Sequence, residues 1–127
     1  MVSMPPVRHL RSLLLAAFVA VTACIAPTLP IPPPSQPEVT APDSTGLVTV
    51  RGGKGAATAG AQLTVWNATY ADSAACHADV SCAPGVVRQV GADGSYVVHI
   101  AGKSKDTLYV WQTVGTQTSG ETETRVP

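Results

Sequence analysis

Residues 46–127 predict an all-β domain, a small antiparallel β-sandwich of six to seven strands. Three observations favour this fold class. Short β-branched runs are separated by Gly, Asp and Ser, no long stretch repeats its apolar residues at the helical period, and Asp93-Gly94 is the strongest hairpin signal. A barrel built from the same strands is the alternative.

Six strands are expected. Composition identifies three of the turns between them, at residues 52–55, 92–94 and 102–106, which are rich in Gly, Asp, Lys and Ser. The expected strands are Leu47–Arg51, Ala61–Asn67, Val86–Val90, Ser95–Ala101, Thr107–Thr113 and Thr122–Val126.

Alternation within these strands assigns side chains to two faces, because successive residues of a strand point to opposite sides. One parity is apolar and predicts the core between two sheets: Val48, Val50, Leu63, Val65, Tyr96, Val98, Ile100, Leu108 and Val110. The opposite parity predicts the outer faces: Thr49, Arg51, Thr64, Trp66, Val97, His99, Tyr109 and Trp111.

Four segments resemble one known group of sandwiches. They are Gly46-Leu-Val-Thr-Val, Gly60-Ala-Gln-Leu-Thr-Val-Trp, Ala92-Asp-Gly-Ser-Tyr-Val-Val-His-Ile and Asp106-Thr-Leu-Tyr-Val. Their succession is similar to that of the carboxypeptidase regulatory-like group of Ig-like domains. The resemblance implies a transthyretin-like fold and a non-enzymatic accessory or binding role. Residues 68–85 depart from it, because this Cys-containing loop is longer than the group's usual connection.

The N-terminus has the pattern of an export signal. Basic residues up to Arg11 precede an apolar run, Leu13–Ala23, which is too short to span a membrane. Val21-Thr22-Ala23-Cys24 resembles the bacterial lipobox. The resemblance implies that residues 1–23 are a cleaved signal peptide, that Cys24 is lipidated, with palmitate as a label of its acyl chains, and that the lipid holds the protein to a membrane. Ile25, in place of the Asp that retains lipoproteins at the inner membrane, favours the outer membrane of a two-membrane cell.

Residues 24–45 predict a disordered Pro-rich linker after the lipidated cysteine. Seven of the eleven prolines of the chain lie between residues 25 and 45, without an apolar period. Extended at about 3.1 Å per residue, this segment would reach roughly 65 Å from the lipid. A docking site for a Pro-binding partner is the alternative.

Cys76 and Cys82 remain once Cys24 carries the lipid, and an exported compartment permits them to form a disulfide. So short a loop would add roughly 2 kcal/mol to stability. The run 76–82 also holds His77 and Asp79, which raises a metal site as the alternative, but the spacing is unlike that of zinc sites and no second Cys pair exists. We therefore expect neither a metal nor a cofactor.

Catalytic motifs are not found in the sequence. It contains neither Gly-x-Ser-x-Gly nor His-Glu-x-x-His, and His99 is expected to be an ordinary outward strand residue. The acceptor pattern for glycosylation at Asn67-Ala68-Thr69 is expected to be a chance match. We expect a protein that is not an enzyme, with a small envelope enzyme as a rival hypothesis.

Trp66, Tyr109 and Trp111 form the candidate binding patch, because the core parity places all three on an outer face. Adjacent exposed aromatic side chains would dominate an interface. The alternatives are that the loop 68–85 covers these residues, or that they belong to the core.

Charge argues against nucleic acid as a partner. Beyond residue 23 the chain has six Lys and Arg residues against eight Asp and Glu, and the basic ones are scattered. The sequence therefore predicts a lipid-anchored cell-envelope protein that presents a structural or protein-interaction module, with another envelope protein or a cell-wall polymer as partner. The alternatives are a carbohydrate- or peptidoglycan-binding module that uses the exposed Trp and Tyr side chains, and a metal carrier that uses the loop Cys76–Cys82.

Overall fold

The computed structural model describes residues 29–127. The expected signal peptide, residues 1–23, and the expected lipidation site, Cys24, lie outside the described residues. Within residues 29–127, no helix has the length and apolar character needed to span a membrane.

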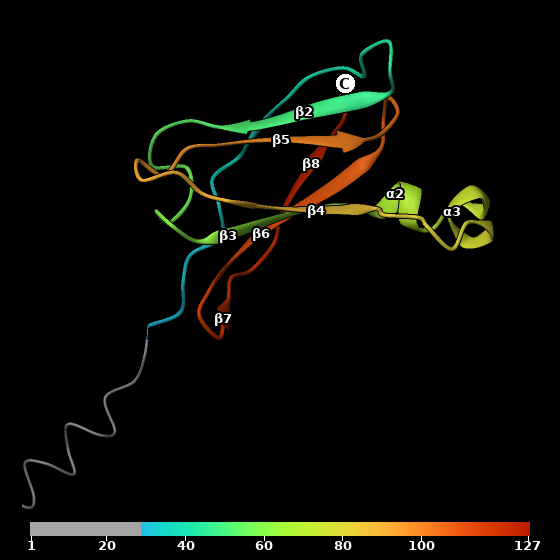
Figure 1. Ribbon diagram of the computed structural model, residues 1–127. Helices are drawn as coiled ribbons and strands as arrows, with labels where there is room; N and C mark the ends of the chain where they lie inside the picture. The colour runs from blue at the N-terminus through green and yellow to red at the C-terminus, as the bar shows by residue number, and fades with distance from the viewer. Residues whose placement is uncertain (1–28) are drawn as a thin grey trace, which may run out of the picture.

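Two antiparallel sheets form a β-sandwich (Figure 1). The three-stranded sheet has the order β1-β2-β5, with β1 at Glu38–Val39, β2 at Leu47–Gly52 and β5 at Tyr96–Ala101. The five-stranded sheet has the order β4-β3-β6, with β7 and β8 side by side with different parts of β6 along its other edge. Its strands are β4 at Gly85–Gln89, β3 at Gln62–Asn67, β6 at Thr107–Val114, β7 at Gln117–Thr118 and β8 at Thr122–Arg125.

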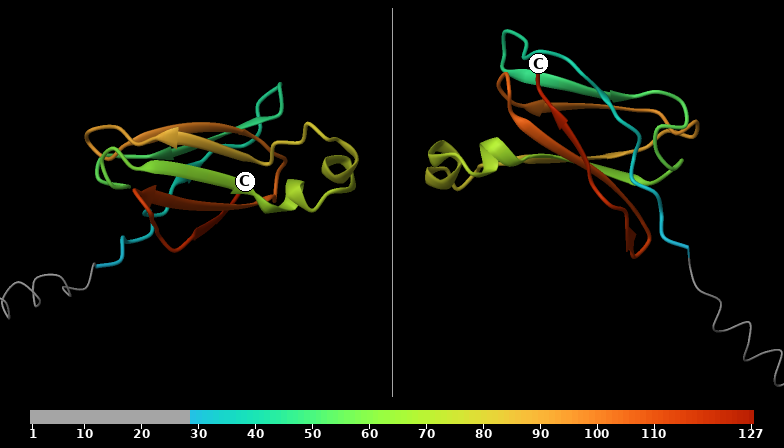
Figure 2. Two further views of the ribbon diagram at one scale, coloured as in Figure 1. Left: turned by 60° about the horizontal axis from the view of Figure 1, so that its bottom comes forward. Right: turned by 180° about the vertical axis from the view of Figure 1, so that it is seen from behind.

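Two short helices project from one end of the sandwich. α2 (Ala68–Ala71) follows β3 directly, and α3 (Ala74–Ala78) lies farther from the sheets (Figures 1 and 2). The described chain begins at the opposite end of the sandwich (Figure 1). The two ends of the domain therefore differ, one carrying the Cys-containing loop and the other the incoming chain.

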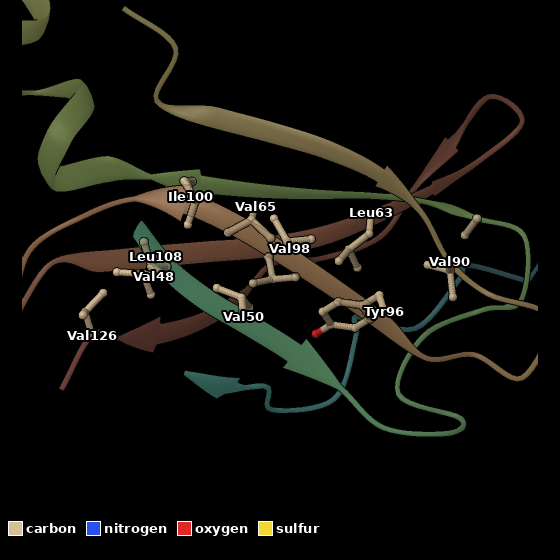
Figure 3. Packing of buried hydrophobic residues seen from close by; sticks show 12 residues of the cluster. Val48, Val50, Leu63, Val65, Val90, Tyr96, Val98, Ile100, Leu108 and Val126 are labelled. Carbon is tan, nitrogen blue, oxygen red and sulfur yellow. The ribbon is translucent and has the colours of Figure 1, made fainter. Parts of the chain in front are cut away.

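The core lies between the sheets and consists of the residues that alternation predicts. Every residue of the inward parity is buried, with Tyr96 the most accessible at 4 % exposure. Ala61, Val90 and Val126 join them in one cluster (Figure 3). Burial of Tyr96 raises the pKa of its phenol. The all-β sandwich and its inner face are confirmed.

The expected strands agree with the observed ones to within one residue at each end, and residues 29–127 hold eight strands, seven of them within residues 46–127. The two additional strands, β1 and β7, have two residues each. Strands this short have too few positions for alternation to be recognised. β1 also lies inside the Pro-rich segment, directly after Pro37, and prolines argue against a strand in a sequence pattern.

The Pro-rich segment differs from the disordered linker that the sequence predicts. Pro34 and Pro37 are buried, and Glu38 and Val39 pair with β2. The carbonyl oxygen of Pro32 accepts a hydrogen bond from Gln112 Nε2 at 2.7 Å. The ordered domain therefore begins near residue 32 rather than at residue 46.

The unequal widths of the two sheets explain this packing. A three-stranded sheet does not cover the whole inner face of a five-stranded one, and the incoming chain packs beside β6 and β8. Proline has no backbone N–H but keeps its carbonyl, so such a segment needs donors from its surroundings. Gln112 and Thr122 supply these donors, to the carbonyl oxygens of Pro32 and Pro34.

Gln112 connects this segment to the core. Its side chain is 1 % exposed, its Oε1 accepts from the backbone N–H of Thr58 at 2.7 Å, and its Nε2 donates to Pro32. In the sequence, Gln112 continues the inward parity of Leu108 and Val110. A polar residue at an inward position of a strand indicates that its side chain has a hydrogen-bond partner in another segment. This was the signal in the sequence for the contact with Pro32.

We expect Gln112→Ala to lower the free energy of unfolding by about 1 to 2 kcal/mol, because two partly buried backbone groups lose their hydrogen-bond partner. Urea denaturation measures the change, and limited proteolysis should show faster cleavage before residue 40. Gln62→Ala is the matched control, since Gln62 is exposed on β3; its effect should stay within about 0.5 kcal/mol. Equal effects of the two substitutions would contradict this role of Gln112.

Candidate binding site

The three aromatic residues lie together on the outer face of the five-stranded sheet. In the register of β3 and β6, Trp66 is opposite Tyr109 and Thr64 is opposite Trp111. Directly opposite residues on one face of an antiparallel pair lie about 5 Å apart at their Cβ atoms, and diagonal neighbours remain within reach of aromatic rings. The register therefore brings the three predicted aromatic residues together on one outer face.

These side chains line an open hollow of about 790 Å³. Trp66 is 37 % exposed, and Tyr109 and Trp111 are partly exposed. The remaining lining comes from β3, β4, the ends of the Cys-containing loop and the turn before β8: Thr64, Ala68, Ala83, Pro84, Gly85, Val87 and Glu121. The loop 68–85 borders the hollow and leaves the aromatic residues accessible.

Gly85 determines how the indole of Trp66 lies. Gly85 is the partner of Trp66 in the register of β4 and β3. A Cβ atom on Gly85 would be only 2.8 Å from Cε3 of Trp66 and 3.2 Å from Cζ3. The Cε3–Cζ3 edge of the indole therefore lies against the glycine, and this contact requires that position 85 have no side chain.

Acidic residues border the hollow on the side of β8. Glu121 lines it, and Glu123 is opposite Tyr109 in the register of β8 and β6. Both residues are exposed. No Lys or Arg is among the lining residues.

Asn67 holds the Cys-containing loop to the end of the sandwich. Its Oδ1 accepts from the N–H of Tyr70 and caps α2, while its Nδ2 donates to the carbonyl of Ala101 and, at 2.9 Å, to Asp106 Oδ2. Asn67 is 0 % exposed. Its amide nitrogen is thus buried and makes two hydrogen bonds in the folded domain.

Cys76 and Cys82 form the disulfide that the sequence predicts. Cys76 is buried in α3, where Ser73 Oγ accepts from its backbone N–H. Asp79 accepts from both the N–H and the hydroxyl of Ser81, and this bonding lowers the pKa of the Asp79 carboxyl. The disulfide closes the loop just before Ala83 and Pro84, which border the hollow.

Within residues 29–127, no three His, Cys, Asp or Glu side chains gather as a metal site requires. His77 is exposed on α3, whereas His99 is on β5, where its Nδ1 lies 3.1 Å from Thr49 Oγ1. The disulfide engages both thiols of the loop, so a metal carrier would need ligands other than Cys76 and Cys82.

Gly85, Val87 and Glu121 are site residues that the sequence does not predict. Their contribution depends on which strands flank β3 and β6, and strand order is not readable from alternation. The available signal for Gly85 was a glycine beside a strand, which often marks the close approach of another group.

Comparison with known proteins found no matching protein family, no matching characterised sequence and no matching solved structure. The specific likeness to the carboxypeptidase regulatory-like group therefore remains a prediction.

We expect Gly85→Ala to displace the indole of Trp66 and shift its fluorescence emission, because the new methyl group would occupy the position of the ring. The measurement is made in a Trp111→Phe background. The chain has two Trp residues, so Trp66 is then the only one that contributes to the emission. Gly53→Ala is the control, since a Cβ there meets nothing within 4 Å. An unchanged emission spectrum in Gly85→Ala would refute the positioning role of Gly85.

Proposed function

We propose that this chain is an exported, lipid-anchored protein of the cell envelope whose β-sandwich acts as a binding module. The observation that carries the proposal is the gathering of Trp66, Tyr109 and Trp111 in one open hollow. Apolar side chains gathered in an open hollow of a folded domain are typical of a site of interaction. The role is interaction rather than catalysis.

A protein partner is the favoured ligand class. Trp and Tyr are enriched among the residues that contribute most to protein interfaces, because they bury much area with little loss of side-chain freedom. The sheet beneath these side chains is rigid, since the inward residues of β3 and β6 are fully buried. A preorganised surface loses less entropy on binding.

A glycan of the cell wall is the second candidate, and a particular set of residues favours it. Gln62 pairs with Gln89 on one side and with Thr113 on the other, so a polar row lies next to the aromatic ones on the same face. Sugars bind by stacking on aromatic rings while their hydroxyl groups hydrogen-bond to amide and hydroxyl side chains.

The envelope location rests on the N-terminal sequence. The lipobox-like segment ends at Cys24, and the disulfide Cys76–Cys82 fits an oxidising compartment outside the cytosol. The outer membrane is preferred because Ile25 follows the cysteine.

Substitution of the two Trp residues tests the binding role. We expect Trp66→Ala and Trp111→Ala each to remove a specific crosslink between the full chain and an envelope partner in cells, detected by mass spectrometry. Val97→Ala is the control, since Val97 is a 51 % exposed apolar residue on the other sheet. Crosslinks that persist in both Trp variants, together with lowered melting temperatures, would assign these residues to stability instead.

Substitution of the cysteine tests the anchor. We expect Cys24→Ser to abolish metabolic labelling with palmitate and to release the protein from membranes, because the thiol is the point of acylation. Cys76→Ser/Cys82→Ser is the control and should keep its label. Retained labelling of Cys24→Ser would refute the lipobox interpretation.

A further inference from the structure

We infer that the hollow on the five-stranded sheet binds a cationic side chain, Lys or Arg, carried by an extended segment of a partner polypeptide. This inference rests on the proposed binding role and adds the chemistry of the ligand. Three features carry it: the charge at the border of the hollow, an accessible indole, and the edge strand beside it.

The charged side chains at the border of the hollow include two exposed glutamates. Glu121 lines the hollow and Glu123 faces the same surface from β8, opposite Tyr109. Both carboxylates are exposed, and the hydrogen bond from Gln36 Nε2 to Glu123 goes to its backbone carbonyl. Arg125 shares this face of β8 but lies one row beyond Glu123, opposite Thr107. Glu121 is the one charged residue among those that line the hollow, and its carboxylate favours a cation there.

The accessible indole of Trp66 favours the same ligand. Its Cε3–Cζ3 edge lies against Gly85, while the side chain is 37 % exposed and lines the hollow. A cation within about 6 Å of an aromatic face is attracted by the ring quadrupole, most strongly over Trp, and Arg also stacks on the ring. Trp111 and Tyr109 extend this surface along β6 toward the two glutamates.

The edge of the sheet favours a polypeptide over a small free cation. β4 borders the hollow through Gly85 and Val87, and it pairs with β3 on one side only within the described chain. An unpaired strand edge presents backbone groups to which an extended segment can bind. The hollow, at about 790 Å³, has room for a long side chain together with its flanking backbone.

Fluorescence of the full chain in detergent tests this inference directly, because both Trp residues of the protein lie in the hollow. The probes are acetylated, amidated tetra-arginine and tetra-lysine, compared with tetra-glutamine and with a tetramer of N-acetylglucosamine. We expect saturable changes with the cationic peptides alone, weakened as salt rises from about 50 mM to about 500 mM.

Charge variants locate the effect. Glu121→Gln should weaken tetra-arginine binding about two- to fivefold, and Glu121→Lys by about tenfold. Glu38→Lys is the matched control, since it makes the same charge change on an exposed residue of the other sheet, and it should bind almost as the native chain does.

Several outcomes would overturn the inference. Equal loss in Glu38→Lys and Glu121→Lys would indicate attraction to net charge alone, and no response to either cationic peptide would exclude the ligand class. Saturable binding of the sugar without salt dependence would assign the hollow to a glycan. None of these results bears on the proposed binding role, which is tested separately by crosslinking of the Trp variants. A failure of this inference can therefore be distinguished from a failure of the proposed function.

Discussion

The register of β3 against β6 is the constraint on which both the core and the binding site depend. Trp66 is opposite Tyr109, and one position further along, Val65 is opposite Val110. Because side chains alternate, this single alignment places the valines between the sheets and the aromatic rings outside. A slip of one strand by one residue would turn its valines outward and its aromatic residues inward. The hydrophobic pairs that stabilise the fold therefore also hold the outer surface in its geometry.

Each end of the sandwich is closed by one buried amide. Gln112 joins Thr58 to Pro32 at the end where the chain enters, and Asn67 joins α2 to Asp106 at the end of the Cys-containing loop. An amide suits this position because it offers a donor and an acceptor without a charge to desolvate. The irregular segments are thus attached to the sheets by two polar side chains. Each of them is the last buried, inward-pointing residue of its strand, directly after the apolar core residues.

Local patterns predicted most of the fold, and the remainder depends on long-range pairing. Alternation in Tyr96–Ala101 or Thr107–Val114 is visible within a few residues, so the strands and their faces were predictable, and the cysteine count predicted the disulfide. Gly85 and Glu121 join the hollow only because β4 and β8 flank the central strands. The helices, four and five residues long, are capped by Asn67 and Ser73 but are too short to show a period. Whether the three aromatic residues bind a partner is a question of function that neither alternation nor register decides.

The ordered start of the domain near Pro32 limits how far the molecule can search for partners. With a lipid on Cys24, as proposed, only residues 25–31 separate the cysteine from Pro32. At about 3.1 Å per residue these seven residues would reach at most roughly 22 Å, rather than the roughly 65 Å of an extended segment 25–45. The end of the sandwich where the chain enters would then stay beside the headgroups, and the opposite end, with α2 and α3, would point away from the bilayer (Figure 1). The domain would sample a thin shell next to its own membrane, so its partners would be molecules that are themselves concentrated at that surface.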